Sequence, residues 1–189
     1  MRLPAEYRLL HENAARQLSG WRAPDPAQET LRAGYLAHLA AHPDAMWKLG
    51  PPAHFTASCL VLNPTGTRAL LTLHKKAKVW FQFGGHFEPG DTDAHAAAQR
   101  EAREESGMTS LVARPELVQL DRHLLVGSFG HCLEHLDMRF LAVADDDASH
   151  VVSEESLEVR WWPVDALPEE TRDELKPLVA IGRAVLGLT

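Results

Sequence analysis

The stretch GGHFEPGDTDAHAAAQREAREESGM, residues 84–108, decides how the chain folds. A glycine pair and a Pro89–Gly90 turn come first, and proline followed by glycine is a strong turn signal. An alanine-rich segment with three glutamates and two arginines follows. The acidic and threonine side chains between the turn and the alanines are residue types that cap helices. The stretch therefore predicts a loop followed by a helix over residues 93–106.

The carboxylates of this helix share a face with its alanines. At about 100° of rotation per residue, Glu101 and Glu105 fall within roughly 60° of Ala94, on the face along which a helix normally packs. Glu104 flanks them, whereas Arg103 points to the opposite side. Like charges four residues apart destabilise a bare helix by a few tenths of a kcal/mol, and a divalent cation among them would reverse that effect. Clustered carboxylate oxygens suit Mg²⁺ or Mn²⁺.

A solvated surface helix is the alternative interpretation. In that case Arg100 and Glu104 form an ordinary i,i+4 pair and the other charges only add solubility. The glycine pair favours a metal site, because glycine leaves the backbone accessible. Backbone and carboxylate oxygens can then surround one ion.

At these residues the sequence resembles the Nudix hydrolases, whose signature is G-x5-E-x7-R-E-U-x-E-E-x-G-U, with U a bulky aliphatic residue. Gly85 is followed by five residues and then Asp91, and the end of the pattern is matched by Arg100, Glu101, Glu104, Glu105, Gly107 and Met108. Three positions depart from the signature. Asp91 replaces the glutamate, eight residues instead of seven precede Arg100, and Ala102 replaces the aliphatic residue. We expect the extra residue to lie between Gly90 and Ala96, before the helix.

The resemblance covers about residues 54–189 and implies an α+β (mixed α/β) fold, an α/β/α sandwich with a mixed sheet. Residues 51–189 would form the Nudix domain, and residues 1–50 a helical N-terminal extension. The implied activity is the Mg²⁺- or Mn²⁺-dependent hydrolysis of a diphosphate linkage, usually in a nucleoside diphosphate derivative. The partner would then be a small-molecule nucleotide or another diphosphate.

By position, the resemblance implies that the Gly85 carbonyl and the carboxylates of Glu101, Glu104 and Glu105 are metal ligands. Arg100 would orient the glutamates through charge-assisted hydrogen bonds. The general base stays open between Glu101 and a residue from a later loop.

Two other functions are compatible with such a domain. One is a catalytically silent Nudix domain that binds a nucleotide as a sensor, which the intact set of three glutamates disfavours. The other is isomerase chemistry of the isopentenyl-diphosphate type, which needs a cysteine as an acid–base partner. Cys59 lies in the middle of a predicted strand, so this second alternative is disfavoured.

The rest of the chain supplies helices before the signature and strands around it. Helices are expected over residues 4–19 and 27–41 and at the C-terminus, and strands in FTASCLVLN, RALLTLHKKA, VWFQF, ELVQLDRHLLV, LDMRFLAVAD and EVRWWPV. This order favours an α+β sandwich over a doubly wound parallel sheet. The stripe of Leu31, Tyr35 and Leu39 should pack on the core or on a second subunit. A homodimer therefore remains open.

Several side chains outside the signature are weaker candidates. His131, Cys132, His135 and Asp137 lie close together, but their spacing matches no common zinc pattern, so a polar pocket wall is the preferred interpretation. Glu154 and Glu155 are expected in a solvated loop. Trp161 and Trp162 should point to opposite faces of a strand, which would leave one of them able to stack on a base.

Composition limits the classes of partner. The 189 residues carry a formal net charge of −7, which argues against nonspecific nucleic-acid binding. No apolar run approaches the roughly 20 residues of a transmembrane helix, and the first residues lack the apolar core of a signal peptide. We therefore expect no membrane partner. The two cysteines are far apart in sequence, so a reducing, cytoplasmic location is expected.

Overall fold

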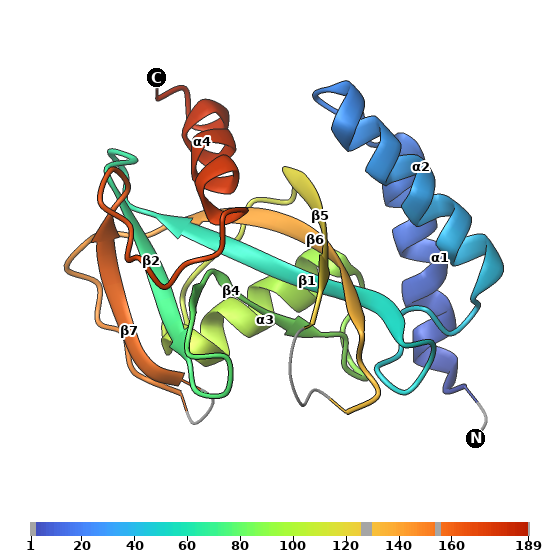
Figure 1. Ribbon diagram of the computed structural model, residues 1–189. Helices are drawn as coiled ribbons and strands as arrows, with labels where there is room; N and C mark the ends of the chain where they lie inside the picture. The colour runs from blue at the N-terminus through green and yellow to red at the C-terminus, as the bar shows by residue number, and fades with distance from the viewer. Residues whose placement is uncertain (1–2, 126–129, 154–155, 189) are drawn as a thin grey trace.

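The structure is a computed structural model that describes residues 3–125, 130–153 and 156–188. Within these residues, seven strands form one mixed sheet (Figure 1). The strands are β1 (Ala53–Leu62), β2 (Arg68–His74), β3 (Trp80–Phe81), β4 (Phe83–His86), β5 (Gln119–Leu124), β6 (Glu134–Val143) and β7 (Ser156–Pro163).

Strand β1 is the centre of the sheet. It pairs in parallel with β6 over its whole length and antiparallel with β2 and β4. The main order is β3-β2-β1-β6-β5, with β4 also on β1 and β7 also on β2. Nine of the ten residues of β1 are buried, because both faces of this strand are covered.

Four helices in the described residues cover the two faces of the sheet (Figure 1). α1 (Ala5–Gly20), α2 (Pro26–Ala41) and α3 (Ala94–Ser106) share one hydrophobic cluster with one face, and α4 (Leu175–Val185) packs on the other. The alternation of β1 explains the division, since Ala57 faces the first cluster and Leu60 the second. The expected α/β/α sandwich with a mixed sheet is confirmed.

The N-terminal helices pack on the rest of the chain. Tyr35 and Leu39 are almost fully buried, and Leu31 packs against the same cluster. The Gln28 side chain donates to the carbonyl of Leu120 at 3.0 Å and accepts from its N–H at 2.7 Å. The apolar stripe is therefore covered within the chain itself.

The glycine pair lies in a strand, where the sequence indicated a loop. Gly84 and Gly85 are part of β4 and stand opposite Ser58 and Ala57 of β1. A Cβ atom on Gly84 would collide with Ser58, so the two strands can approach only because the residue is glycine. Gly84 is therefore needed for the close packing of β4 against β1.

Candidate active site

The signature helix begins where the sequence predicted. The Asp93 carboxylate accepts the N–H of Ala96 at 2.8 Å and caps α3. Residues 91–93 precede the helix without helical structure, and Gly90 has a φ of +113°. Residues 91–93 thus form the connection in which we expect the extra residue, and α3 runs without interruption from Ala94 to Ser106.

Arg100 connects the turn, the helix and β4. Its Nε and Nη2 atoms both donate to the Asp91 carboxylate at 3.0 Å. Its Nη1 atom donates to Glu101 at 2.9 Å and to Glu104 at 3.1 Å. Nη2 also donates to the carbonyl of His86 at 3.0 Å. The aspartate that departs from the signature thus still pairs with the signature arginine.

Glu101 lies against the second glycine of β4. A Cβ atom on Gly85 would lie 2.5 Å from the Oε1 atom of Glu101, so any larger residue would displace this carboxylate. Burial raises the pKa of Glu101 to about 7, and the charge of Arg100 offsets only part of that rise. The Glu101 carboxylate is thus held between the backbone of Gly85 and the guanidinium of Arg100.

Glu105 and Glu104 occupy different environments. Glu105 is buried, and its Oε2 atom accepts the N–H of Gly84 at 3.0 Å. The Glu104 side chain is 60% exposed. The carboxylate oxygens of Glu101, Glu104 and Glu105 do not all lie within 4.8 Å of one another in the described structure. The helix and β4 thus hold two carboxylates against the glycine pair, with Glu104 at its edge.

A cavity of about 540 Å³ opens beside β4. Gly84, Gly85 and Glu105 line it together with residues of β1, β2 and β6. Three lysines also line it, Lys48, Lys75 and Lys76, whereas the lining arginines Arg139 and Arg172 are paired with Asp137 and Glu174. Such a lining attracts an anionic ligand.

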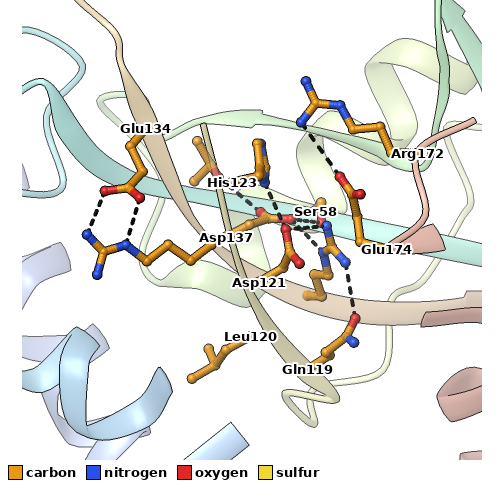
Figure 2. Close-up of polar contacts among 12 residues, drawn as sticks. Ser58, Gln119, Leu120, Asp121, His123, Glu134, Asp137, Arg172 and Glu174 are labelled. Atoms are coloured by element: carbon orange, nitrogen blue, oxygen red, sulfur yellow. Dashed lines mark hydrogen bonds and ion pairs between the residues drawn. The ribbon is translucent and has the colours of Figure 1, made fainter. Parts of the chain in front are cut away.

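A hydrogen-bonded network forms one wall of the cavity (Figure 2). Asp137 accepts the hydroxyls of Thr56 at 3.0 Å and Ser58 at 2.6 Å. The Nε atom of Arg139, a residue with 1% of its side chain exposed, donates to the same carboxylate at 3.0 Å. Because each buried charge is paired, this wall is rigid and stays polar.

Asp121 extends the network along β5. Its Oδ2 atom lies 2.9 Å from Nη2 of Arg139 and 2.8 Å from Nδ1 of His123. Burial alone would raise the pKa of Asp121, but the hydrogen bond from His123 and the charge of Arg139 outweigh it and lower the pKa. Asp121 is therefore held as a carboxylate.

Part of the expected polar wall is confirmed. His135 and Asp137 both line the cavity, because they lie two residues apart on β6 and share one face of the strand. His131 lies outside the strand and contacts the Gly50 carbonyl at 2.7 Å. Cys132 is buried 4.0 Å from the Nε2 atom of His86. Burial lowers the pKa of His86 and of His135 to about 3, so both rings are neutral at pH 7.

The expectation that a tryptophan stacks on a base is not supported. Trp161 packs in the cluster under α1–α3, and Trp162 packs in the cluster under α4. Neither is among the residues that line the described cavity, where Phe81 is the aromatic side chain. Glu154 and Glu155 lie outside the described residues.

Sequence reasoning missed His54, His86, Phe81 and Lys48. His86 directly follows the glycine pair, and that position beside a proposed ligand was the available signal. Lys48 lies between α2 and β1 and reaches the cavity only through the tertiary fold. No pattern in the sequence marks it.

A NUDIX domain profile matches residues 52–180. The chain belongs to the Nudix family. No helix in the described parts of this Nudix protein is both long and apolar enough to cross a bilayer. The chain has no significant match among curated proteins.

Solved structures of similar fold agree with the family assignment. A NUDIX family hydrolase from Clostridium perfringens is 23% identical with a TM-score of 0.52, over 71% of this chain and 97% of that one. A C. elegans Ap4A hydrolase is 19% identical with a TM-score of 0.56, over 70% and 97%. The E. coli dihydroneopterin triphosphate pyrophosphohydrolase is 18% identical with a TM-score of 0.55, over 72% and 96%. At these identities the likeness concerns the fold.

Proposed function

We propose that this Nudix protein hydrolyses a diphosphate linkage in a small nucleoside diphosphate derivative, with Mg²⁺ or Mn²⁺ as cofactor. The observation that carries the proposal is the placement of Glu101 and Glu105 against Gly84 and Gly85 at the edge of a cation-lined cavity. Two similar structures are named for Ap4A and dihydroneopterin triphosphate, and both compounds are phosphate anhydrides. These names support the substrate class.

The donor set fits a hard divalent cation. The Gly85 carbonyl, Glu101, Glu104 and Glu105 would hold it, since Mg²⁺ and Mn²⁺ prefer oxygen ligands. When bound, the cation would neutralise the diphosphate oxygens and lower the pKa of an attacking water. Arg100 positions Glu101 and Glu104 for this task, because it already binds both carboxylates.

The chain's own residues supply the rest of the chemistry. Water attacks one phosphorus atom and the bridging P–O bond breaks. Glu101 is our candidate for the base that accepts the water proton, because its carboxylate lies against Gly85, which lines the cavity. The cationic side chains Lys48, Lys75 and Lys76 would hold the remaining charge of the substrate.

We further propose that residues 1–50 form an extension that shapes the entrance of the cavity of domain 51–189. Three contacts support this. The Tyr7 hydroxyl donates to the Phe87 carbonyl at 3.3 Å, Asn13 donates to the Thr92 carbonyl, and Lys48 lines the cavity. We place the protein in the cytoplasm, because both cysteines are free thiols.

The deciding experiment is Glu105→Gln assayed on a panel of nucleotides, nucleotide sugars and dinucleotide polyphosphates. The change keeps the size and the acceptor for the Gly84 N–H but removes the charge. We expect kcat to fall on the order of 10²–10⁴-fold with folding intact. EDTA should abolish the wild-type activity, and Mg²⁺ or Mn²⁺ should restore it.

The matched control is Glu116→Gln, whose side chain is 62% exposed and lies outside the signature. It should leave kcat unchanged. A Glu105→Gln protein with the wild-type rate would overturn the assignment of the site. Substrate binding without phosphate release across the whole panel would favour a silent sensor. The isomerase alternative is disfavoured because burial raises the pKa of Cys59 to about 12.

A further inference from the structure

Four residues with nitrogen or sulfur ligand atoms converge beside β4, outside the glutamate site. They are His54 of β1, His86 of β4, Cys132 just before β6 and His135 in β6, and one ligand atom of each lies within 4.8 Å of the others. The strand register brings them together. His54 stands directly opposite His135, and His86 stands opposite Thr56, two residues along β1. Side chains two residues apart on a strand share a face.

The ring nitrogens of this cluster are arranged to accept a ligand. Nδ1 of His54 lies 2.9 Å from the Pro51 carbonyl, which can only accept, so this nitrogen carries the hydrogen. The neutral ring then presents the lone pair of Nε2, which lies 3.0 Å from Nε2 of His86. A hydrogen bond from the far nitrogen to a backbone carbonyl is the usual support of a metal-binding histidine.

The third histidine, His135, has a buried nitrogen that makes no hydrogen bond to the described residues. Nε2 of His135 is buried and has no hydrogen-bond partner among the residues that the structure describes. A buried polar atom without a hydrogen-bond partner lowers the stability of the fold by about 1–3 kcal/mol, and a bound ion would remove this cost. The His135 ring lies 5.3 Å from that of His54 and 5.0 Å from that of His86, centroid to centroid.

We propose that His54, His86, Cys132 and His135 bind one Zn²⁺ ion. Zinc with Zn–N bonds of ~2.0–2.1 Å and Zn–S bonds of ~2.3 Å separates its tetrahedral ligand atoms by about 3.3–3.6 Å. The two measured separations, 3.0 Å between the histidine nitrogens and 4.0 Å from sulfur to nitrogen, lie on either side of that range. Imidazole and thiolate select zinc, whereas the oxygen ligands around Glu101 select magnesium or manganese.

Four protein ligands leave no open position on a tetrahedral zinc, so this site is structural. It would tie β4 to β1 and to the start of β6. His86 follows Gly85, and its carbonyl accepts a hydrogen bond from Arg100. The zinc would therefore fix the backbone on which the proposed hydrolase site is built, although zinc binding itself does not depend on that proposal.

A second cluster of possible metal ligands, which includes two carboxylates, is a weaker candidate for a metal site. Ligand atoms of Asp121, His123 and Glu174 also lie within 4.8 Å of one another. However, Asp121 is paired with Arg139 and His123, and Glu174 lies 3.6 Å from Arg172 (Figure 2). These charges are already compensated.

The test uses the untagged full-length chain, purified under reducing conditions without chelator. Mass spectrometry of the metal content should find one zinc per chain. Replacement of that zinc by Co²⁺ should give the intense visible bands of tetrahedral cobalt and a thiolate-to-cobalt charge-transfer band. Cys132→Ser should lose the charge-transfer band. The neighbouring change His131→Ala should keep both, because His131 contacts the Gly50 carbonyl and is not one of the four proposed ligands.

A protein that takes up neither Zn²⁺ nor Co²⁺ would overturn the proposal, and so would a Cys132→Ser protein with an unchanged cobalt spectrum. If the serine variant does not fold, the wild-type chain still decides the matter. Zn²⁺, but not Mg²⁺, should protect Cys132 from alkylation, with the fully buried Cys59 as the internal reference. Equal alkylation of Cys132 with and without Zn²⁺ would refute zinc binding. None of these measurements depends on hydrolase activity.

Discussion

Asp91→Asn should both destabilise the protein and weaken the proposed metal site. The Asp91 carboxylate accepts two hydrogen bonds of 3.0 Å from Arg100 and one of 2.8 Å from the N–H of Glu88, and only 4% of its side chain is exposed. Asparagine has nearly the same shape, but it loses the charge. The NH₂ group of the asparagine would also face one of the N–H donors of Arg100 or Glu88, where no acceptor is left for it.

Removing one partner of a buried ion pair costs about 3–5 kcal/mol. Arg100 is 20% exposed and keeps its bonds to Glu101, Glu104 and the His86 carbonyl. We therefore expect a smaller loss, about 2–4 kcal/mol, dominated by the lost charge and the mismatched amide. For a chain of this length, each kcal/mol shifts Tm by roughly 2–4 °C, so Tm should fall by about 5–15 °C.

Urea denaturation of both proteins measures the loss in free energy, and an unchanged m value would show that the unfolded state is the same. Once released from Asp91, Arg100 should also hold Glu101 less firmly, so the Mg²⁺ concentration for half-maximal activity should rise. Glu116→Gln is the matched control and should stay within about 0.5 kcal/mol of the wild type. An Asp91→Asn protein whose stability and Mg²⁺ dependence equal those of the wild type would refute the reasoning.

Three further changes test other parts of the structure. Gly85→Ala should leave Tm nearly unchanged but lower kcat by about 10²-fold, because the new Cβ displaces only the flexible end of Glu101; an active alanine variant would contradict this. Gln28→Ala should cost about 1–3 kcal/mol in urea denaturation, because the N–H and carbonyl of Leu120 lose their partner. For Asp121→Asn, the sign follows from the lowered pKa of the native carboxylate. Its stabilisation is present above the unfolded pKa of about 3.9 and is lost as pH falls through the native pKa. The stability difference between wild type and variant should therefore shrink on acidification below about pH 4, and a constant difference would show that Asp121 is not the group involved.

The sequence predicted local features well. The helix over residues 93–106 appears as α3, and its cap at Asp93 depends only on neighbouring residues. The hydrophobic periodicity of α2 likewise predicted that Tyr35 and Leu39 are buried. These features are encoded within a few turns of chain, where spacing and residue type determine the structure.

Long-range pairing could not be predicted. The residues 80–86 divide into β3 and β4, because β2 pairs with the first part and β1 with the second. Likewise, the sequence grouped His131 and Cys132 with His135 and Asp137 in a polar pocket wall. The structure instead brings His54 and His86 to Cys132, through strand registers that no local pattern specifies.

The departures from the Nudix signature at Asp91 explain one another. Aspartate is one methylene shorter than the usual glutamate, so its carboxylate reaches less far toward Arg100. One extra residue lengthens the segment between Asp91 and Arg100 by up to about 3.3–3.6 Å, which is more than enough to compensate. Gly90, in a backbone conformation that other residues rarely adopt, lets the chain turn just before Asp91. The result is a two-bond contact between Asp91 and Arg100, so the shorter side chain and the insertion together allow one guanidinium to bind Asp91, Glu101 and Glu104.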